Sequence, residues 1–239
     1  MKKLVLTTAC VLAMAGAAFA QNLNWGSISF SAMTAQTNST QYSPFLGGAS
    51  VSGGAVGSTA TGALNTYYEL LYNTTFTGSQ ATIGTLSSLL TTWTDTGLGA
   101  TNNPSSAGRL SVINPNTAAT VPWTTTTNNI VLVGWSADLG STWVGVSNLL
   151  AAAATGNNSL LQTQLAGQEG FFGISTTGYT TTGSSNPGAT VFSSAATAQG
   201  LPIFSTNTQL YLLPVPEPAT MALAGLGGLS LMLFRRQRK

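Results

Sequence analysis

The segment NIVLVGWSA, residues 129–137, decides the expected fold of this chain. It is a continuous apolar and β-branched run, the pattern of a strand buried on both faces at the centre of a sheet. The segment NTYYELLYNTTFT, residues 65–77, is the second of this kind. Its apolar residues fall on both faces at a period of two, which predicts another central strand that is covered on both sides.

Shorter runs of strand composition surround these two segments. They are residues 23–34, 109–113, 170–177, 190–193 and 208–213. Residues 45–62 and 95–106 are rich in Gly, Ser, Thr and Asn, and we expect loops there, the first with at most one weak strand. The sequence between residues 23 and 213 therefore predicts short strands separated by polar loops.

Two short helices interrupt the strand pattern. Leu86, Leu89, Leu90 and Trp93 form one apolar stripe at helical spacing. A second helix follows residues 129–137: Ser141 can cap its N-terminus, and the turn sequence TGNNS at 155–159 would end it. With no repeat of fixed period, the predicted fold class is mainly β. The expected architecture is a single antiparallel β-sandwich or jelly-roll-like domain with one or two short helices, at residues 21–213.

The C-terminal residues have the order of a sorting signal. Pro216, Glu217 and Pro218 come first, and the prolines keep this triplet extended. An uncharged apolar run of 16 residues follows at 219–234 and predicts a short transmembrane helix of roughly 24 Å. The basic tail at 235–239, including Arg235 and Arg236, is expected to stay in the cytoplasm, with the body of the chain on the other side.

Triplet, apolar run and terminal arginines, in this order, closely resemble the PEP-CTERM sorting signal of bacterial surface proteins, which is also filed as an ice-binding-protein C-terminal domain. The resemblance covers residues 214–239, about a tenth of the chain. It implies recognition by exosortase, a membrane-embedded cysteine transpeptidase, and cleavage near Pro216 to Pro218. It also implies release or transfer to the envelope or the exopolysaccharide matrix. It implies nothing about the activity of the body.

The N-terminus predicts export. Lys2 and Lys3 precede an apolar stretch, and Ala18-Phe19-Ala20 stands before Gln21. This is the pattern of a secretory signal peptide at 1–20, cleaved after Ala20 and handled by the Sec translocon. Cleavage removes Cys10, so the mature chain would contain no cysteine and no disulfide.

Charge and composition exclude several classes of function. Outside the two terminal segments the only cation is Arg109, against four acids, which gives a formal charge of −3. A basic surface for nucleic acid is therefore not expected. The chain has no histidine, which excludes Ser-His-Asp and Cys-His nucleophile systems and the usual zinc sites. We expect no catalytic residue, metal or cofactor, and thus no enzyme.

The remaining candidates for chemistry are the four acids Glu69, Asp95, Asp138 and Glu169. Two of them could form a glycosidase pair about 5–10 Å apart, although turn-like surroundings favour a structural role for most. Asp95 begins a single DTG triplet, whereas aspartic proteases need two such aspartates sharing a proton. Glu69 is expected on a sheet face, hydrogen-bonded to Arg109 or to a tyrosine hydroxyl, with an active-site role as the alternative.

Aromatic residues offer one candidate for ligand binding. Most of the five tryptophans are expected in the core. Trp123, between Pro122 and a run of threonines, is the one predicted to be exposed and able to stack on a sugar.

Three functions are compatible with these observations. The first is a secreted or surface-targeted structural or matrix protein, held transiently at the inner membrane and processed by exosortase. The second is a carbohydrate-binding module for extracellular polysaccharide, and the third is a glycosidase that uses carboxylates alone. The sorting signals favour the first, because they enclose a body without recognisable catalytic groups.

Overall fold

The computed structural model describes residues 22–24, 34–46, 48–50, 56–59, 66–102, 110–112, 119–120, 126–181, 189–192, 196–197, 200–203, 207–214 and 226. Several predicted features lie outside these residues. They are the signal peptide at 1–20, its cleavage residues Ala18, Ala20 and Gln21, Trp123, Pro216, Glu217, Pro218, Arg235 and Arg236, and, apart from Leu226, the span at 219–234.

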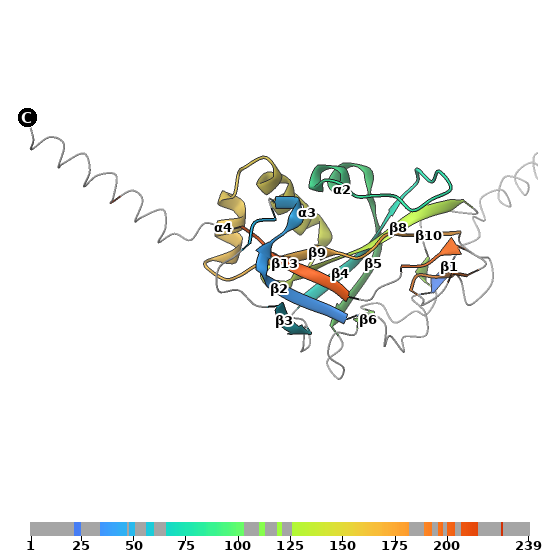
Figure 1. Ribbon diagram of the computed structural model, residues 1–239, viewed down its shortest axis with the longest axis horizontal. Helices are drawn as coiled ribbons and strands as arrows, with labels where there is room; N and C mark the ends of the chain where they lie inside the picture. Colours follow the sequence, from blue (N-terminus) through green and yellow to red (C-terminus); the bar gives the residue numbers. More distant parts are fainter. Residues whose placement is uncertain are drawn as a thin grey trace, which may run out of the picture.

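One large sheet dominates the described body (Figure 1). Its strands follow the spatial order β3-β2-β13-β9-β8-β4-β5-β6, and β10 pairs with both β8 and β12. The bounds are β2 (Thr34–Tyr42), β3 (Val56–Thr59), β4 (Thr66–Asn73), β5 (Thr94–Asn102), β6 (Leu110–Val112), β8 (Thr127–Ser136), β9 (Phe171–Ile174), β10 (Gly178–Thr181), β12 (Gly200–Leu201) and β13 (Asn207–Leu212). A small second sheet contains β1 (Asn22–Asn24), β7 (Ala119–Thr120) and β11 (Ala189–Thr190).

The two strands predicted at the centre of the sheet are confirmed. β4 and β8 pair antiparallel over their whole common length, from Thr66 opposite Ser136 to Asn73 opposite Asn129. Both faces of β4 are buried, since Leu70 and Leu71 point to opposite sides and each is 0% exposed. The strands expected at 109–113, 170–177 and 208–213 are also present, as β6, β9 and β13.

The prediction of a mainly β fold is confirmed, but its purely antiparallel pairing is wrong. β13 runs parallel to β2, from Asn207 opposite Thr34 to Tyr211 opposite Asn38. Parallel neighbours need a long crossover, and here most of the chain lies between the two strands. In addition, one face of the sheet is covered by helices, where a sandwich would have its second sheet (Figure 1).

Three helices and two single turns complete the described fold. They are α2 (Leu86–Thr92), α3 (Trp143–Ala154), α4 (Ser159–Leu165), and the 3₁₀ turns η1 (Pro44–Leu46) and η2 (Ala137–Leu139). The first two helices were predicted. The cap of α3 is Thr142, whose side chain accepts the N–H of Gly145, and not Ser141. No helix was predicted at α4.

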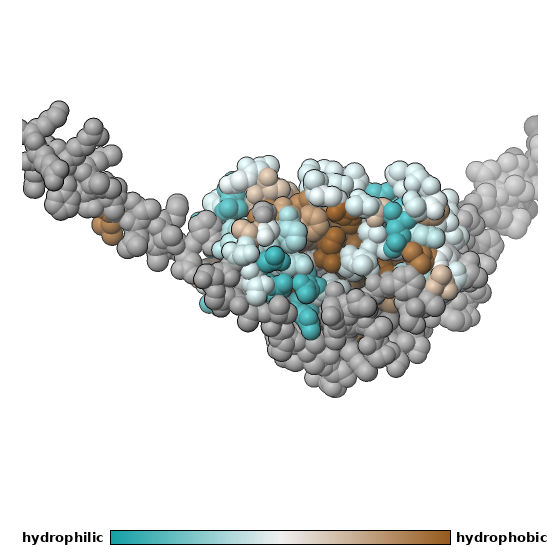
Figure 2. All heavy atoms as spheres, in the orientation of Figure 1, coloured by the Kyte–Doolittle hydropathy of each residue, from teal (hydrophilic) through white to brown (hydrophobic). Residues whose placement is uncertain are grey.

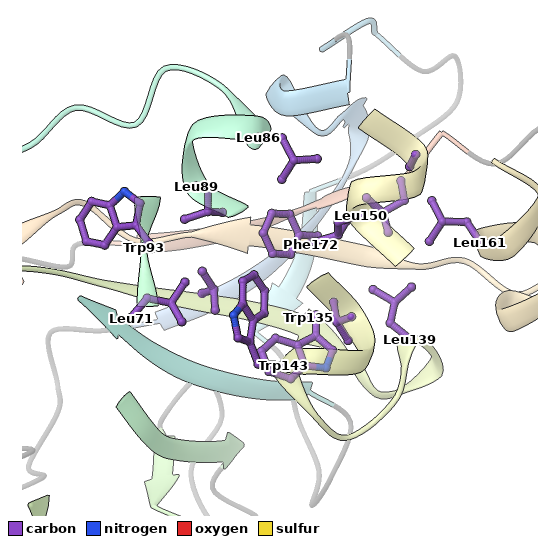
Figure 3. Close-up of a cluster of buried hydrophobic side chains, with 14 of the residues drawn as sticks. Leu71, Leu86, Leu89, Trp93, Trp135, Leu139, Trp143, Leu150, Leu161 and Phe172 are labelled. Atoms are coloured by element: carbon purple, nitrogen blue, oxygen red, sulfur yellow. The ribbon is translucent and has the colours of Figure 1, made fainter. Parts of the chain in front are cut away.

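The helix face of the sheet is packed with large side chains. Trp135 of β8 contacts Trp143 of α3 at a ring-centroid distance of 5.8 Å and stacks on Tyr67 of β4 at 6.3 Å. Leu89 of α2 and Leu150 of α3 lie in the same cluster (Figure 3). Because α2 and α3 were predicted from apolar stripes, this core is the burial of those stripes against the odd-numbered residues of β8.

The second face of the sheet carries a smaller cluster. Tyr68, Leu70 and Leu132 belong to it, and in the described chain its cover includes Phe192 and Ile203. Gly134 lies beneath the Tyr68 ring, where a Cβ would come within 2.8 Å of two ring carbons. Glycine at this position is thus required by close packing and not by turn geometry.

Candidate functional site

Residues 94–102 form a strand with a local bulge, which corrects the loop expected at 95–106. Leu70 pairs with Leu98 and Leu71 with Asp95, so that two residues of β5 are left opposite none of β4. Gly97 has φ of +73°, a backbone conformation that favours glycine. The Thr96 hydroxyl donates to the Leu70 carbonyl at 2.7 Å. The DTG triplet is therefore a bulge within the sheet.

The bulge directs Asp95 toward Glu69. The Asp95 carboxylate accepts the Gly97 N–H at 2.7 Å, which fixes its orientation. Glu69 lies on the helix face of β4, opposite Gly99 of β5, which has no side chain. The two carboxyl groups hydrogen-bond each other.

This contact changes the protonation of Glu69. Burial, the hydrogen bond to Asp95 and the charge of Asp95, in that order, raise the pKa of Glu69 to about 9. At neutral pH Glu69 is therefore a neutral acid that donates its proton to Asp95. Its Oε1 atom is buried and has no hydrogen-bond partner within the described part of the chain. The predicted position on a sheet face is confirmed. Arg109, one of the expected partners, lies outside the described residues, and the partner that the structure shows is Asp95.

The geometry of this pair favours a structural role. Glycosidase carboxyls stand about 5–10 Å apart, with the scissile bond between them. Here the two carboxyls are in direct contact, and no substrate atom fits between them. A proton shared by two carboxyls is also the arrangement of aspartic proteases, but Oε1 of Glu69 is enclosed rather than open to a substrate.

The other two acids do not join this pair. Asp138 is exposed in η2, where its backbone carbonyl accepts the side-chain amide of Gln164 at 3.1 Å. Glu169 is exposed in the turn that precedes β9. Across the described ranges, no three residues among His, Cys, Asp and Glu gather in a group that could hold a metal ion.

The tryptophans that can be located lie in the core. Trp93, Trp135 and Trp143 are each less than a tenth exposed, as predicted. A second buried polar pair lies on the other face of the sheet, where the Tyr68 hydroxyl donates to Asn102 Oδ1 at 2.9 Å. Burial raises the pKa of Tyr68, so the phenol stays protonated.

The sequence did not predict the pairing of Glu69 with Asp95. One signal was available. The segment TDTGLGATN, residues 94–102, contains two isolated glycines, Gly97 and Gly99, and an isolated glycine in a strand indicates a bulge. The cross-strand neighbour of Glu69 depends on where that bulge falls, which local sequence does not specify.

The chain leaves the fold beside a small cavity. β13 ends at Leu212, and Leu213 is buried, with its N–H bonded to the Gly170 carbonyl at 2.8 Å. The next residue, Pro214, lines a cavity of about 420 Å³ together with Phe45 of η1 and Ala154 of α3. Figure 2 shows hydrophobic atoms exposed between the helices on this side of the molecule. The described residues of the body thus reach as far as Pro214.

Comparison with known proteins identifies the segment that begins at this residue. Residues 214–239 match the family model of the PEP-CTERM protein-sorting motif. No curated protein and no solved structure significantly matches the chain. Among the described residues, no helix has the length and apolar character needed to cross a bilayer. The motif supports targeting by exosortase and export to the cell surface or secretion.

Proposed function

We propose that this chain is a non-enzymatic surface or matrix protein whose folded body is delivered by its sorting motif. In this proposal the Sec translocon exports the chain, and residues 219–234 hold it transiently in the inner membrane. Exosortase then cleaves near Pro216 to Pro218, and the body associates with the envelope or with exopolysaccharide.

The observation that carries the proposal is the position of the boundary between fold and motif. Leu213 is the last buried residue of the described body, at 2% exposed, and the motif begins at Pro214. Cleavage at the triplet would therefore remove no strand or core residue of the described fold. A motif that overlapped β13 would destroy the sheet on cleavage, because β13 lies between β2 and β9.

The protonated Glu69 and its partner Asp95 have a structural role in this proposal. They join β4 to the bulge of β5 by a side-chain hydrogen bond on the helix face. A hydrogen bond to a charged group contributes about 1.5–3 kcal/mol when it is satisfied, which offsets part of the cost of burying Glu69 beside a second acid.

The test is the C-terminus of the mature protein. The full chain would be expressed in a host that contains exosortase and in the same host lacking it, and surface fractions would be analysed by mass spectrometry. We expect loss of residues 221–239 only where exosortase is present. Pro216→Ala is expected to block this loss, and Pro214→Ala, the same change two residues earlier, is the matched control. An intact tail on the surface protein of the exosortase host would refute the proposal.

A further inference from the structure

A groove on the helix face of the sheet is lined by no residue of the carboxyl pair and by no residue of the sorting motif. Its volume is about 450 Å³, within the range of small-ligand sites. One wall is the segment Gln80 to Ile83, which leads into α2, and the other is Ile174 to Thr177, between β9 and β10. In Figure 2, hydrophilic and hydrophobic residues adjoin at the end of the molecule where Figure 1 places β10.

Hydrogen bonds between the walls hold this groove in shape. The Gln80 side-chain amide donates to the Thr177 carbonyl, and the Thr177 hydroxyl donates to the Ala81 carbonyl at 2.7 Å. Beneath them, Asn129 of β8 is 1% exposed. Its side chain accepts the Ala81 N–H at 3.0 Å and donates to the Thr75 carbonyl at 3.2 Å. A ligand would therefore meet preformed walls, which lowers the entropic cost of binding.

The chemistry of the lining is uncharged and mixed. Its side chains are hydroxyls, one carboxamide and aliphatic groups, with no ionisable residue. Gln80, Thr82 and Thr176 are exposed, so they are accessible from solvent, while Ile83 and Ile174 are half-buried. An ionic ligand would find no counter-charge here. A purely apolar ligand would cover the amide and the hydroxyls and take away their water.

Two aromatic rings lie outside the lining residues of the groove, at the same end of β8. Phe76 and Tyr179 contact each other with ring centroids 4.9 Å apart. Tyr179 is opposite Asn129 in the pairing of β10 with β8, and Asn129 holds the groove wall at Ala81. Both rings are only half-buried. They supply apolar ring surface at the same end of the sheet as the exposed amide and hydroxyls.

We infer that this groove is a binding site for a neutral saccharide, with Phe76 and Tyr179 contacting a sugar ring and Gln80 and Thr82 hydrogen-bonding its hydroxyls. A pyranose carries an apolar face and a rim of neutral hydroxyls, which matches the two kinds of surface found here. The inference rests on the proposed function, because a matrix protein meets polysaccharide at its destination. It replaces Trp123, which the sequence suggested as the stacking residue, by residues whose surroundings are known.

The test uses purified full-length chain in detergent, with maltohexaose and cellohexaose as neutral probes and oligogalacturonate as an anionic one. We expect binding of at least one neutral probe by calorimetry, weakened about tenfold by Gln80→Ala and by Tyr179→Ala. Gln164→Ala is the matched control, since Gln164 is also exposed and its amide also donates to a backbone carbonyl, that of Asp138. Tyr179→Phe keeps the ring and should retain binding, which separates stacking from misfolding.

Three results would overturn the inference. They are no binding of either neutral hexasaccharide, equal binding by wild type and Gln80→Ala, and binding of oligogalacturonate alone. The proposed function is tested by a different measurement, mass spectrometry of the C-terminus, and it fails if the tail is uncleaved. If the surface protein is correctly processed but binds neither neutral probe, the saccharide site is refuted and the sorting role is not.

Discussion

Leu70 and Leu71 are neighbours in β4, and both are completely buried, yet they belong to different cores. Leu71 packs on the helix face with residues of α2 and α3. Leu70 packs on the second face, where the described cover includes Val191, Phe192 and Ile203. These three come from short segments, joined by a bond from the Ile203 N–H to the Val191 carbonyl at 2.8 Å. Among the described residues, the sheet is thus covered by regular helices on one side and by short extended segments on the other.

The difference shows which kind of cover can be predicted from a single sequence. A helix that covers a sheet has an apolar stripe of its own. In α2 and its C-cap this stripe is formed by Leu86, Leu89 and Trp93. A short segment outside the helices has no such period, so the burial of its few apolar residues against the sheet cannot be predicted from the local sequence. The helix face should accordingly be the more rigid of the two.

The largest expected effect comes from shortening the two leucines separately. Leu70→Ala and Leu71→Ala should each lower the free energy of unfolding by about 2–5 kcal/mol. We expect the loss to be greater for Leu71→Ala, because packed helices collapse into a cavity less easily than irregular chain does. Denaturant unfolding measures both. Equal losses, or a greater loss for Leu70→Ala, would contradict the proposed difference in rigidity.

The next effect concerns pH and belongs to the helix face. The pKa of Glu69 is about 9 in the fold against an ordinary 4.5, so the unfolded chain loses this proton first. As pH rises through this interval the folded state binds the extra proton, and stability falls. Glu69→Gln removes the titration. At pH 9 the free energy of unfolding of the variant should exceed that of the wild type by on the order of a few kcal/mol.

The control for this prediction is Glu169→Gln, the same change at an exposed turn. Urea midpoints at pH 5 and pH 9 would be compared for the three proteins. The midpoint of wild type and of the control should drop at pH 9, whereas that of Glu69→Gln should drop less. If the urea midpoint of Glu69→Gln falls between pH 5 and pH 9 as much as that of the wild type, the titrating group is not Glu69.

A smaller effect is expected at the start of α3. Thr142→Ala removes the side-chain acceptor for the Gly145 N–H and should cost about 1 kcal/mol. Ser141→Ala, the position that the sequence favoured as the cap, should change the melting temperature little. If the two variants lose stability equally, the cap is not Thr142 alone.

The smallest effect is expected on the outer side of the same helix. Val144 is 65% exposed. Val144→Ala should change the free energy of unfolding by no more than about 0.5 kcal/mol, since nothing packed is lost and alanine favours the helix. Thermal unfolding checks this. A large loss would indicate that the exposed side of α3 is covered in solution.

The same contrast explains what the sequence could and could not predict. β4, α2 and α3 were predicted because their apolar residues repeat at the period of the element, and β8 because it is a continuous apolar run. β2, TAQTNSTQY, has no such repeat: its strand conformation comes from pairing with β13 and β3. β5 was missed because DTG is typical of a turn, and α4 because its signal is only seven residues long. Of the candidate site, the position of Glu69 was predicted from its strand, but its partner depended on the register set by the bulge.

The parallel pairing of β13 with β2 has a consequence for the order of events during export. Asn38 and Gln209 join these strands by a side-chain hydrogen bond at 2.9 Å across 171 residues of sequence. In the described sheet β2 has only β3 and β13 as neighbours, so this edge cannot dock until residues 207–212 are available for pairing. Closing so long a loop is a slow step. The sorting motif begins two residues after β13 ends. In the proposed pathway, a chain held by its tail would complete its sheet before it is released.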